Sequence, residues 1–215
     1  MSAREPADQH ISAVYDATSR DDLIARYAIW ADTYDQDLQE VGYLHLPVMI
    51  GLVARHVPRR DATILDAGVG TGAIGALLNL LGYNNLSGID MSPAMLAKAN
   101  KRKCYADLRE AVLGEPLDFV DGSFDAIIST GTFTKGHAPA SAFDELVRLL
   151  EKDGVLIFTV GTIIWEEQGF KSKLDGLIAT GKLKPIETTP IYCPMPFSKT
   201  ESDYTTRAHV FRKVG

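Results

Sequence analysis

The sequence contains little cysteine: Cys104 and Cys193 are the two cysteines in 215 residues, and they lie far apart. Two cysteines cannot build a disulfide framework and lack the spacing of metal ligands, so we expect a reducing compartment and no metal site. An apolar run long enough to cross a bilayer is also missing, and the first residues lack the apolar core of a secretory signal. These absences predict a cytoplasmic protein that does not contact a membrane.

Positive charge is scarce as well, because 22 Lys and Arg oppose 28 Asp and Glu and give a formal net charge of −6. This balance disfavours a nonspecific grip on a phosphate backbone, so we expect no nucleic-acid partner. The basic cluster at residues 98–103 ends a predicted helix, where cations complement the helix dipole and face water. A nucleic-acid patch is the alternative interpretation of this cluster.

The most informative stretch present is residues 64–72, in which apolar residues lead into Asp66 and then into Gly68, Gly70 and Gly72. This pattern predicts a buried strand that ends in a tight turn and opens a helix. Glycines allow the backbone to approach a ligand where a Cβ would collide, and nucleotide-like ligands bind in such a crevice. Because many folds use a glycine-rich turn, the surrounding sequence has to decide which ligand it serves.

The apolar pattern after residue 61 predicts alternating strands and helices. The expected strands lie at 62–67, 86–90, just ahead of Asp107, 124–129 and 155–160. Two further β-like stretches, 183–192 and 204–212, follow. The repeated order of strand, helix and strand implies an α/β fold with a doubly wound, mostly parallel sheet and helices on both faces.

The residues before the first strand have a different pattern. Residues 1–20 are polar and mixed, and we expect them to form a mobile N-terminal segment. Apolar residues recur at helical spacing from Asp21, and a second helical segment follows at about 43–56. We therefore predict one domain over 21–215, in which an N-terminal helical extension (21–58) precedes the core (62–215).

A glycine turn of this kind can bind a dinucleotide or S-adenosylmethionine, and three features favour the second ligand. The turn reads Asp-x-Gly-x-Gly-x-Gly and not the Gly-x-Gly-x-x-Gly of dinucleotide domains; a helical segment precedes the first strand; and two strand-like segments follow the fifth strand. From Trp30 onward the chain resembles class I S-adenosylmethionine-dependent methyltransferases. Residues 27–43 and 131–146 resemble, more narrowly, the methyltransferase-like family that includes the Williams–Beuren-region methyltransferase.

This resemblance implies a seven-stranded Rossmann-like sheet and S-adenosylmethionine as cofactor, with S-adenosylhomocysteine as product. In the family, the residues that match Gly68, Gly70 and Gly72 carry the methionine part of the cofactor, and the one that matches Asp66 helps to fix its ammonium group. Asp90 ends the second strand, where a carboxylate can accept hydrogen bonds from both ribose hydroxyls. A plain turn residue before a helix is the alternative for Asp90.

Further cofactor contacts are expected from the next strands. Met91 would lie against the adenine ring, with a core filler as the alternative. In the family an acidic residue at the position of Asp107 accepts from the adenine amino group, and the amide of Leu108 addresses a ring nitrogen. The alternative makes Asp107 the N-cap of a helix over 108–112. Ser129 and Thr130 would end the fourth strand beside the sulfonium methyl, where small residues leave room for an acceptor.

The aromatic residues of the first helical segment allow two interpretations. Tyr27, Trp30 and Tyr34 recur at helical spacing, which is typical of core residues. The resemblance instead makes residues 21–58 a lid over the cofactor, with a tyrosine hydroxyl, preferably that of Tyr34, at the cofactor's carboxylate. Such a lid would also exclude water from the reaction.

Methyl transfer from a sulfonium is an in-line displacement that alignment alone can accelerate, so a dedicated base is not required. His137, in the loop after the fourth strand, is the best candidate if one is used, and a structural histidine is the alternative. An Asn/Asp-Pro-Pro-Tyr/Phe segment is missing there, which disfavours methylation of a nucleobase amino group.

The sequence therefore predicts a methyltransferase for a small-molecule acceptor, acting as a monomer or homodimer. A catalytically silent cofactor-binding module that acts through a protein partner is the first alternative. A nicotinamide-dependent oxidoreductase is the second, although the sequence shows no Tyr-x-x-x-Lys or similar hydride-transfer group.

Overall fold

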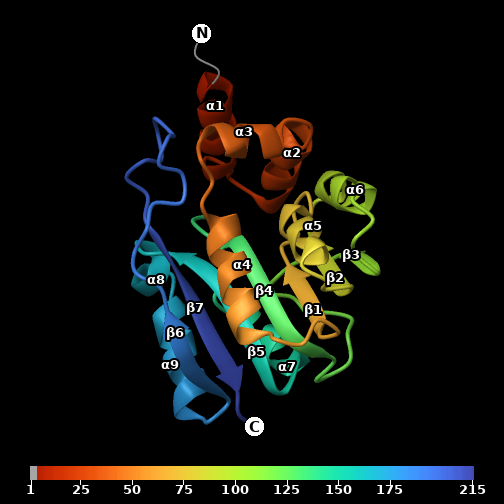
Figure 1. Cartoon of the computed structure of the whole chain (residues 1–215). Helices are drawn as coiled ribbons and strands as arrows, with labels where there is room; N and C mark the ends of the chain where they lie inside the picture. Colours follow the sequence, from red (N-terminus) through yellow and green to blue (C-terminus); the bar gives the residue numbers. More distant parts are fainter. Residues whose placement is uncertain (1–3) are drawn as a thin grey trace.

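The computed structural model describes residues 4–215, and its centre is a seven-stranded sheet in the order β3-β2-β1-β4-β5-β7-β6 (Figure 1). The strands are β1 (Thr63–Ala67), β2 (Asn85–Asp90), β3 (Asp107–Glu110), β4 (Phe124–Phe133), β5 (Leu150–Gly161), β6 (Leu183–Thr188) and β7 (Thr206–Lys213). The first five pair in parallel, whereas β7 runs antiparallel to both β5 and β6. The predicted doubly wound, mostly parallel sheet is confirmed.

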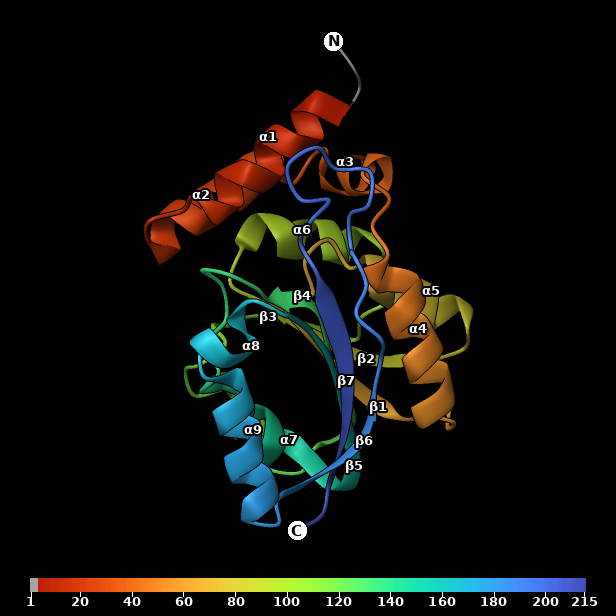
Figure 2. The ribbon, with the colours of Figure 1, turned by 90° about the vertical axis from the view of Figure 1, so that its left-hand side faces the viewer.

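Helices cover both faces of this sheet (Figure 2). On one face lie α4 (His45–His56) and α5 (Ala73–Leu80), which bury Met49, Leu52 and Leu78 against β1 and β4. On the other face lie α7 (Ala142–Leu149), α8 (Ile164–Glu167) and α9 (Phe170–Ala179), which pack around Phe143 and Phe158. Because both faces are covered, the central strands are continuously apolar, as parallel strands usually are.

Helix α6 (Pro93–Lys101) packs against β2 and β3. Its start follows the expected chemistry, since the Ser92 hydroxyl accepts a hydrogen bond from the Met95 amide at 3.4 Å and Pro93 occupies the first helical position. No helix within residues 4–215 combines the length and the apolar character needed to span a bilayer.

Three helices precede α4: α1 (Arg4–Tyr15), α2 (Arg20–Trp30) and α3 (Tyr34–Glu40). The prediction of a mobile segment over 1–20 is wrong where α1 lies, because Ala7, Ile11 and Val14 are buried against the neighbouring helices. The polar average of this segment concealed a single apolar stripe at helical spacing. Residues 1–3 of the predicted mobile segment lie outside the described residues.

The strand expected ahead of Asp107 begins at Asp107 itself. Asp107 pairs with Ser87 in the middle of β2, and Glu110 pairs with Asp90 at its carboxyl end. The alternative of a helix over 108–112 is also wrong, because this stretch belongs to β3 and the segment after it. A four-residue edge strand with polar, exposed side chains carries little of the apolar alternation by which strands are recognised.

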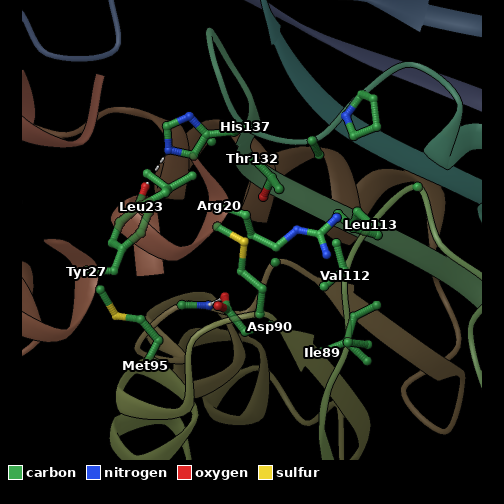
Figure 3. A pocket seen from close by; sticks show the side chains of 18 of the residues that line it. Arg20, Leu23, Tyr27, Ile89, Asp90, Met95, Val112, Leu113, Thr132 and His137 are labelled. Carbon is green, nitrogen blue, oxygen red and sulfur yellow. Dashed lines mark hydrogen bonds between the residues drawn. The ribbon is translucent and has the colours of Figure 1, made fainter. Parts of the chain in front are cut away.

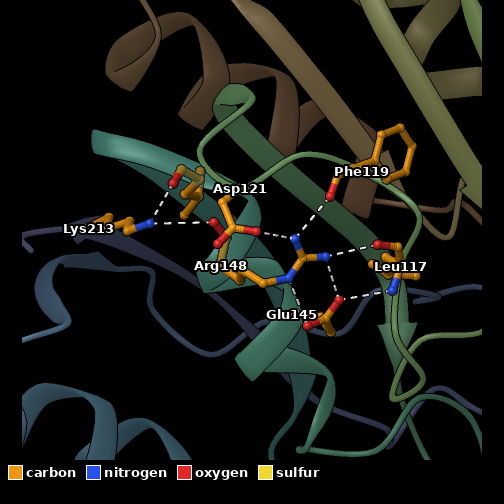
Figure 4. Close-up of polar contacts among 7 residues, drawn as sticks. Leu117, Phe119, Asp121, Glu145, Arg148 and Lys213 are labelled. Atoms are coloured by element: carbon orange, nitrogen blue, oxygen red, sulfur yellow. Dashed lines mark hydrogen bonds and ion pairs between the residues drawn. The ribbon is translucent and has the colours of Figure 1, made fainter.

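The irregular segment after β3 is fixed by one arginine of α7 (Figure 4). The Arg148 guanidinium donates to the carbonyls of Leu117 at 2.8 Å and Phe119 at 2.9 Å, and it forms ion pairs with Glu145 and Asp121. The Glu145 carboxylate in turn accepts the Leu117 amide at 2.9 Å. This network holds the segment against the sheet without regular secondary structure.

Candidate functional site

The order of the strands reverses between β1 and β4, and the glycine turn leaves β1 at this switch point, where α/β folds bind ligands. A cavity of about 270 Å³, here named the cofactor cavity, opens at this edge (Figure 3). Its walls come from α2, the glycine turn, the end of β2, the segment after β3 and the loop after β4. They include Tyr27, Tyr34, Gly68, Gly70, Asp90, Met91, Met95, residues 111–115, residues 130–132 and His137.

The three glycines of the turn have different surroundings. A Cβ on Gly68 would lie 2.3 Å from the Thr132 hydroxyl oxygen, whereas a Cβ on Gly70 would meet nothing within 4 Å. Both glycines line the cofactor cavity. Gly72, with φ +76°, is the N-cap of α5 and packs against Ala99, so it does not line the cavity as the sequence interpretation expected.

Asp90 presents a fixed carboxylate to the cofactor cavity. One oxygen accepts the Gly70 amide at 2.8 Å, and the other accepts the Ser92 amide at 2.9 Å. Each carboxylate oxygen retains a second acceptor position, so two hydroxyls could bind side by side. Burial raises the pKa of Asp90, while the backbone amides act in the opposite direction.

The wall beyond Asp90 comes from residues 111–115, which follow the carboxyl end of β3. Asp107 and Leu108 lie at the other end of that strand, away from the cavity, which contradicts their expected adenine contacts. The Asp107 carboxylate pairs with Arg109 at 2.7 Å instead. Residues 111–115 were missed because the expected strand boundary was wrong, and a register in which β3 ends level with Asp90 would have found them.

Asp66 is buried behind the turn and does not line the cofactor cavity. One of its oxygens accepts the Tyr105 hydroxyl at 2.6 Å, and the other finds no hydrogen-bond partner among residues 4–215. Burial raises the pKa of Asp66 to about 7, against the effect of the Tyr105 hydrogen bond. Sequence reasoning missed Tyr105, which occupies space that a Cβ on Gly72 or Gly75 would fill.

The two small residues of β4 have separate roles. The Ser129 hydroxyl donates to the Ala67 carbonyl at 2.7 Å and is fully buried, so it joins β4 to β1 and does not line the cavity. Thr130 lines the cavity, and its buried hydroxyl oxygen lacks a partner within the described chain. Of the two residues, Thr130 alone lines the cofactor cavity.

The three aromatic residues of the N-terminal helices also differ in whether they line the cofactor cavity. The cofactor cavity is lined by Tyr27, Tyr34 and Met91. Trp30 does not: its indole donates to Asp37 at 2.7 Å, and it is 3% exposed. Trp30 therefore packs in the cluster between the N-terminal helices and does not line the cofactor cavity.

His137 is hydrogen-bonded to helix α2. Its Nδ1 lies 2.9 Å from the Lys135 carbonyl, which can only accept, so Nδ1 carries the proton. Burial lowers the pKa of His137 and favours the neutral ring. The free lone pair on Nε2 then accepts the Tyr27 hydroxyl at 2.8 Å, the contact drawn in Figure 3.

A second, smaller cavity of about 50 Å³ lies behind Tyr27 and Tyr34, and we name it the aromatic chamber. Tyr27, Tyr34 and Gly131 line both cavities, so the two adjoin at these residues. None of its lining residues within the described chain is an Asp, Glu, Lys or Arg. The remaining walls include Ile11, Val14, Tyr15, Trp30, Tyr43, His45, Phe133, Thr134, Thr159, Met195 and Tyr204.

The histidine of the aromatic chamber is uncharged. His45 is 4% exposed, and burial lowers its pKa to about 3. Its Nδ1 lies 2.7 Å from the Tyr192 hydroxyl.

No cluster of three or more His, Cys, Asp or Glu in residues 4–215 could hold a metal ion.

Comparison with known proteins agrees with this architecture. A family model described as a methyltransferase domain matches residues 65–158. The human "Methyltransferase-like protein 27" is 30% identical over 171 residues, which cover 77% of this chain and 69% of the human protein. The "18S rRNA (guanine(1575)-N(7))-methyltransferase" of Saccharomyces cerevisiae is 42% identical over 66 residues, 31% of this chain and 24% of the yeast protein.

The fold itself has solved counterparts. The TehB-like SAM-dependent methyltransferase from Corynebacterium glutamicum superposes with a TM-score of 0.60 at 23% identity, covering 86% of this chain and 98% of that one. The resemblance seen in the sequence is thereby confirmed. Sheet order, glycine turn and human relative together show that the chain belongs to the class I S-adenosylmethionine-dependent methyltransferases and is an enzyme of that family.

Proposed function

We propose that the protein moves the methyl group of S-adenosylmethionine to a small, uncharged acceptor and releases S-adenosylhomocysteine. The observation that carries this proposal is the junction of the two cavities at Tyr27, Tyr34 and Gly131. A donor in the cofactor cavity and an acceptor in the aromatic chamber would meet there. In-line displacement needs this alignment more than it needs a strong catalyst.

The residues of the cofactor cavity suit the donor. The spare acceptor positions of Asp90 match the vicinal ribose hydroxyls, and the segment 111–113 offers an apolar wall for adenine, with Met91 on the opposite side. The absence of a side chain at Gly68 and Gly70 leaves room for the methionine part. Bound S-adenosylmethionine would supply an activated methyl carbon, and these groups would orient it.

Two unpaired buried oxygens add support for this placement. The Thr130 hydroxyl and one oxygen of Asp66 lack partners among residues 4–215, and unpaired buried polar atoms are rare in folded proteins. Because Asp66 lies behind the glycine turn, its oxygen would receive the methionine ammonium through water. Tyr34 adjoins a third cavity of about 330 Å³ on the other side of the glycine turn, and its hydroxyl could bind the methionine carboxylate there.

The acceptor class follows from the walls of the aromatic chamber. Rings and hydroxyls surround it, and a charged acceptor would lose its hydration without gaining an ionic partner. Its small volume suits a small molecule and disfavours an extruded nucleobase. The formal charge of −6 also gives a nucleic acid no electrostatic attraction to the protein as a whole.

Two measurements test this function. Isothermal titration calorimetry should show binding of S-adenosylmethionine and S-adenosylhomocysteine but not of NAD, and binding of NAD alone would refute the assignment. The protein is then incubated with methyl-labelled cofactor and either a low-molecular-mass metabolite extract or total RNA. Label should enter the metabolite fraction, while label in the RNA would show that the acceptor is a nucleic acid.

A further inference from the structure

Tyr27 occupies the boundary between the two cavities, and its hydroxyl points to a histidine. It lines both the cofactor cavity and the aromatic chamber, and its hydroxyl lies 2.8 Å from His137 Nε2. His137 lines the cofactor cavity but not the chamber. A molecule in the chamber would therefore meet Tyr27 directly and His137 only through Tyr27.

The direction of this hydrogen bond is set by its neighbours. Lys135 holds the His137 proton on Nδ1, so Nε2 can receive a proton but has none to give. Tyr27 is half-buried, and burial raises its pKa, with Tyr34, Tyr15 and Asp90 acting in the same direction. The Tyr27 hydroxyl is therefore protonated at rest and can accept a second proton only while it gives its own away.

Other hydroxyls of the chamber lack this arrangement. The Thr134 hydroxyl bonds Tyr204 at 3.1 Å and lies 3.5 Å from that of Tyr15. None of these three can take up a proton near neutral pH. His45, on the opposite wall, pairs with Tyr192, and its lowered pKa makes it a weak proton acceptor.

We infer that Tyr27 and His137 form a proton relay that receives the proton of the methyl acceptor. The inference rests on the proposed function. A lone pair of the acceptor's hydroxyl, thiol or amine forms the bond to the methyl carbon, and the electrons of the carbon–sulfur bond remain on sulfur. The acceptor's proton moves to the Tyr27 oxygen, the tyrosine's own proton moves to His137 Nε2, and the imidazolium later loses it to water. Tyr27 is the catalytic residue, and His137 acts through it.

The test replaces Tyr27 and His137 one at a time by a residue that cannot pass on or take up a proton. Tyr27→Phe removes the hydroxyl, whereas His137→Gln keeps an acceptor for the Tyr27 hydrogen bond but cannot take up a proton. Both should lower kcat about a hundredfold, toward the lower end of general-base effects, with the dissociation constant of S-adenosylmethionine changed less than threefold. The substrate is the metabolite fraction labelled by the wild-type protein.

Matched controls come from the core. Tyr83→Phe removes another buried tyrosine hydroxyl, which donates to the Val57 carbonyl, and His209→Gln replaces another buried histidine bonded to a hydroxyl. Both should leave kcat unchanged. In the wild type kcat should fall as acid protonates His137, and His137→Gln should lack this acid limb. Wild-type rates in both relay variants would overturn the inference.

A second readout needs no acceptor. Nitrogen-15 NMR of the imidazole ring should find the proton of His137 on Nδ1 and a shift of the Nε2 resonance in Tyr27→Phe. A proton on Nε2 would refute the relay even if no methyl transfer is detected. Failure of the proposed function looks different, because S-adenosylmethionine would then not bind the wild-type protein in calorimetry.

Discussion

The cofactor cavity and the aromatic chamber adjoin, yet they are built in opposite ways. The cofactor cavity is built around the glycine turn after β1 and the Asp90 carboxylate at the end of β2, which lie close together in the sequence, and Tyr27 and Tyr34 add to its wall. The chamber is lined by side chains from α1, α2, α3, β4, β5 and the chain around β7. The glycine turn and the end of β2 thus fix part of the cofactor cavity locally, whereas most walls of the chamber come from segments that only the tertiary fold brings together.

One buried carboxylate holds these helices together. Asp37 accepts hydrogen bonds from the Trp30 indole at 2.7 Å, from His10 at 2.8 Å and from the Thr33 hydroxyl at 3.0 Å. It thereby connects α1, α2 and α3. Across the mouth of the cofactor cavity, Arg20 pairs with Glu115 at 2.7 Å. Because the Trp30 ring packs on Tyr34 with a centroid distance of 4.5 Å, and Tyr34 lines both cavities, the Asp37 hub supports a wall that the two cavities share.

The largest effect is expected on the donor side, from Asp90→Ala. Loss of two charge-assisted hydrogen bonds should weaken S-adenosylmethionine binding at least about a hundredfold, or about 3 kcal/mol, in calorimetry. Asp107→Ala is the matched control, since it removes an aspartate from the other end of the neighbouring strand. It should leave the affinity unchanged. Equal losses in both variants would contradict the assignment of Asp90.

The contrast between the two regions also explains what the sequence could predict. The turn at 66–72, the strand that ends at Asp90 and the cap at Ser92 are each encoded within a few neighbouring residues, and the structure has them as expected. The chamber could not be predicted in this way. Tyr15, Tyr43 and Tyr204 belong to distant segments, and only the tertiary fold brings them together.

The errors near Asp107 and at the N-terminus share a physical cause. Edge strand β3 has four residues and helix α1 buries only a narrow stripe, so tertiary packing decides their structure more than local pattern does. Tyr105 was missed for a related reason. Its hydroxyl reaches Asp66 only because Gly72 and Gly75 leave space for the ring. No characteristic spacing in the sequence signals such a contact.

A smaller effect is expected when Gly72 and Gly70 of the same turn are each replaced by alanine. Gly72→Ala places a methyl group 3.1 Å from the Ala99 backbone at a positive φ, so it should lower the free energy of unfolding by about 2 kcal/mol. Gly70→Ala has open space around its Cβ and should cost less stability but more cofactor affinity. Urea unfolding and calorimetry measure the two quantities. The assignment is wrong if Gly70→Ala is the less stable variant and binds the cofactor normally.

Trp30→Phe tests whether the aromatic chamber depends on the hydrogen bonds of Asp37. The variant keeps an aromatic ring but removes one buried donor from Asp37, which should cost about 1.5 kcal/mol of unfolding free energy. Because Trp30 lines the aromatic chamber but not the cofactor cavity, methyl transfer should fall more than S-adenosylmethionine affinity does. Thr33→Val removes a weaker donor to the same carboxylate and should give a smaller change in the same direction. A large loss of cofactor affinity in Trp30→Phe would show that the two sides are not independent.

The smallest expected effect concerns Asp66. It tests whether this buried carboxylate lowers the stability of the folded protein. The pKa of Asp66 is about 7 in the folded protein against an ordinary value of 3.8. Between these values the folded protein holds a proton that the unfolded chain has lost, so this group reduces stability as the pH rises from about 4 to about 7. Asp66→Asn should therefore raise Tm by about 3 °C at pH 8, with the gain shrinking toward pH 5. The same variant should bind S-adenosylmethionine more weakly at pH 8, because its side chain cannot pair with an ammonium group. A variant less stable than wild type at pH 8 would mean that the turn stabilises the ionised carboxylate even without the cofactor.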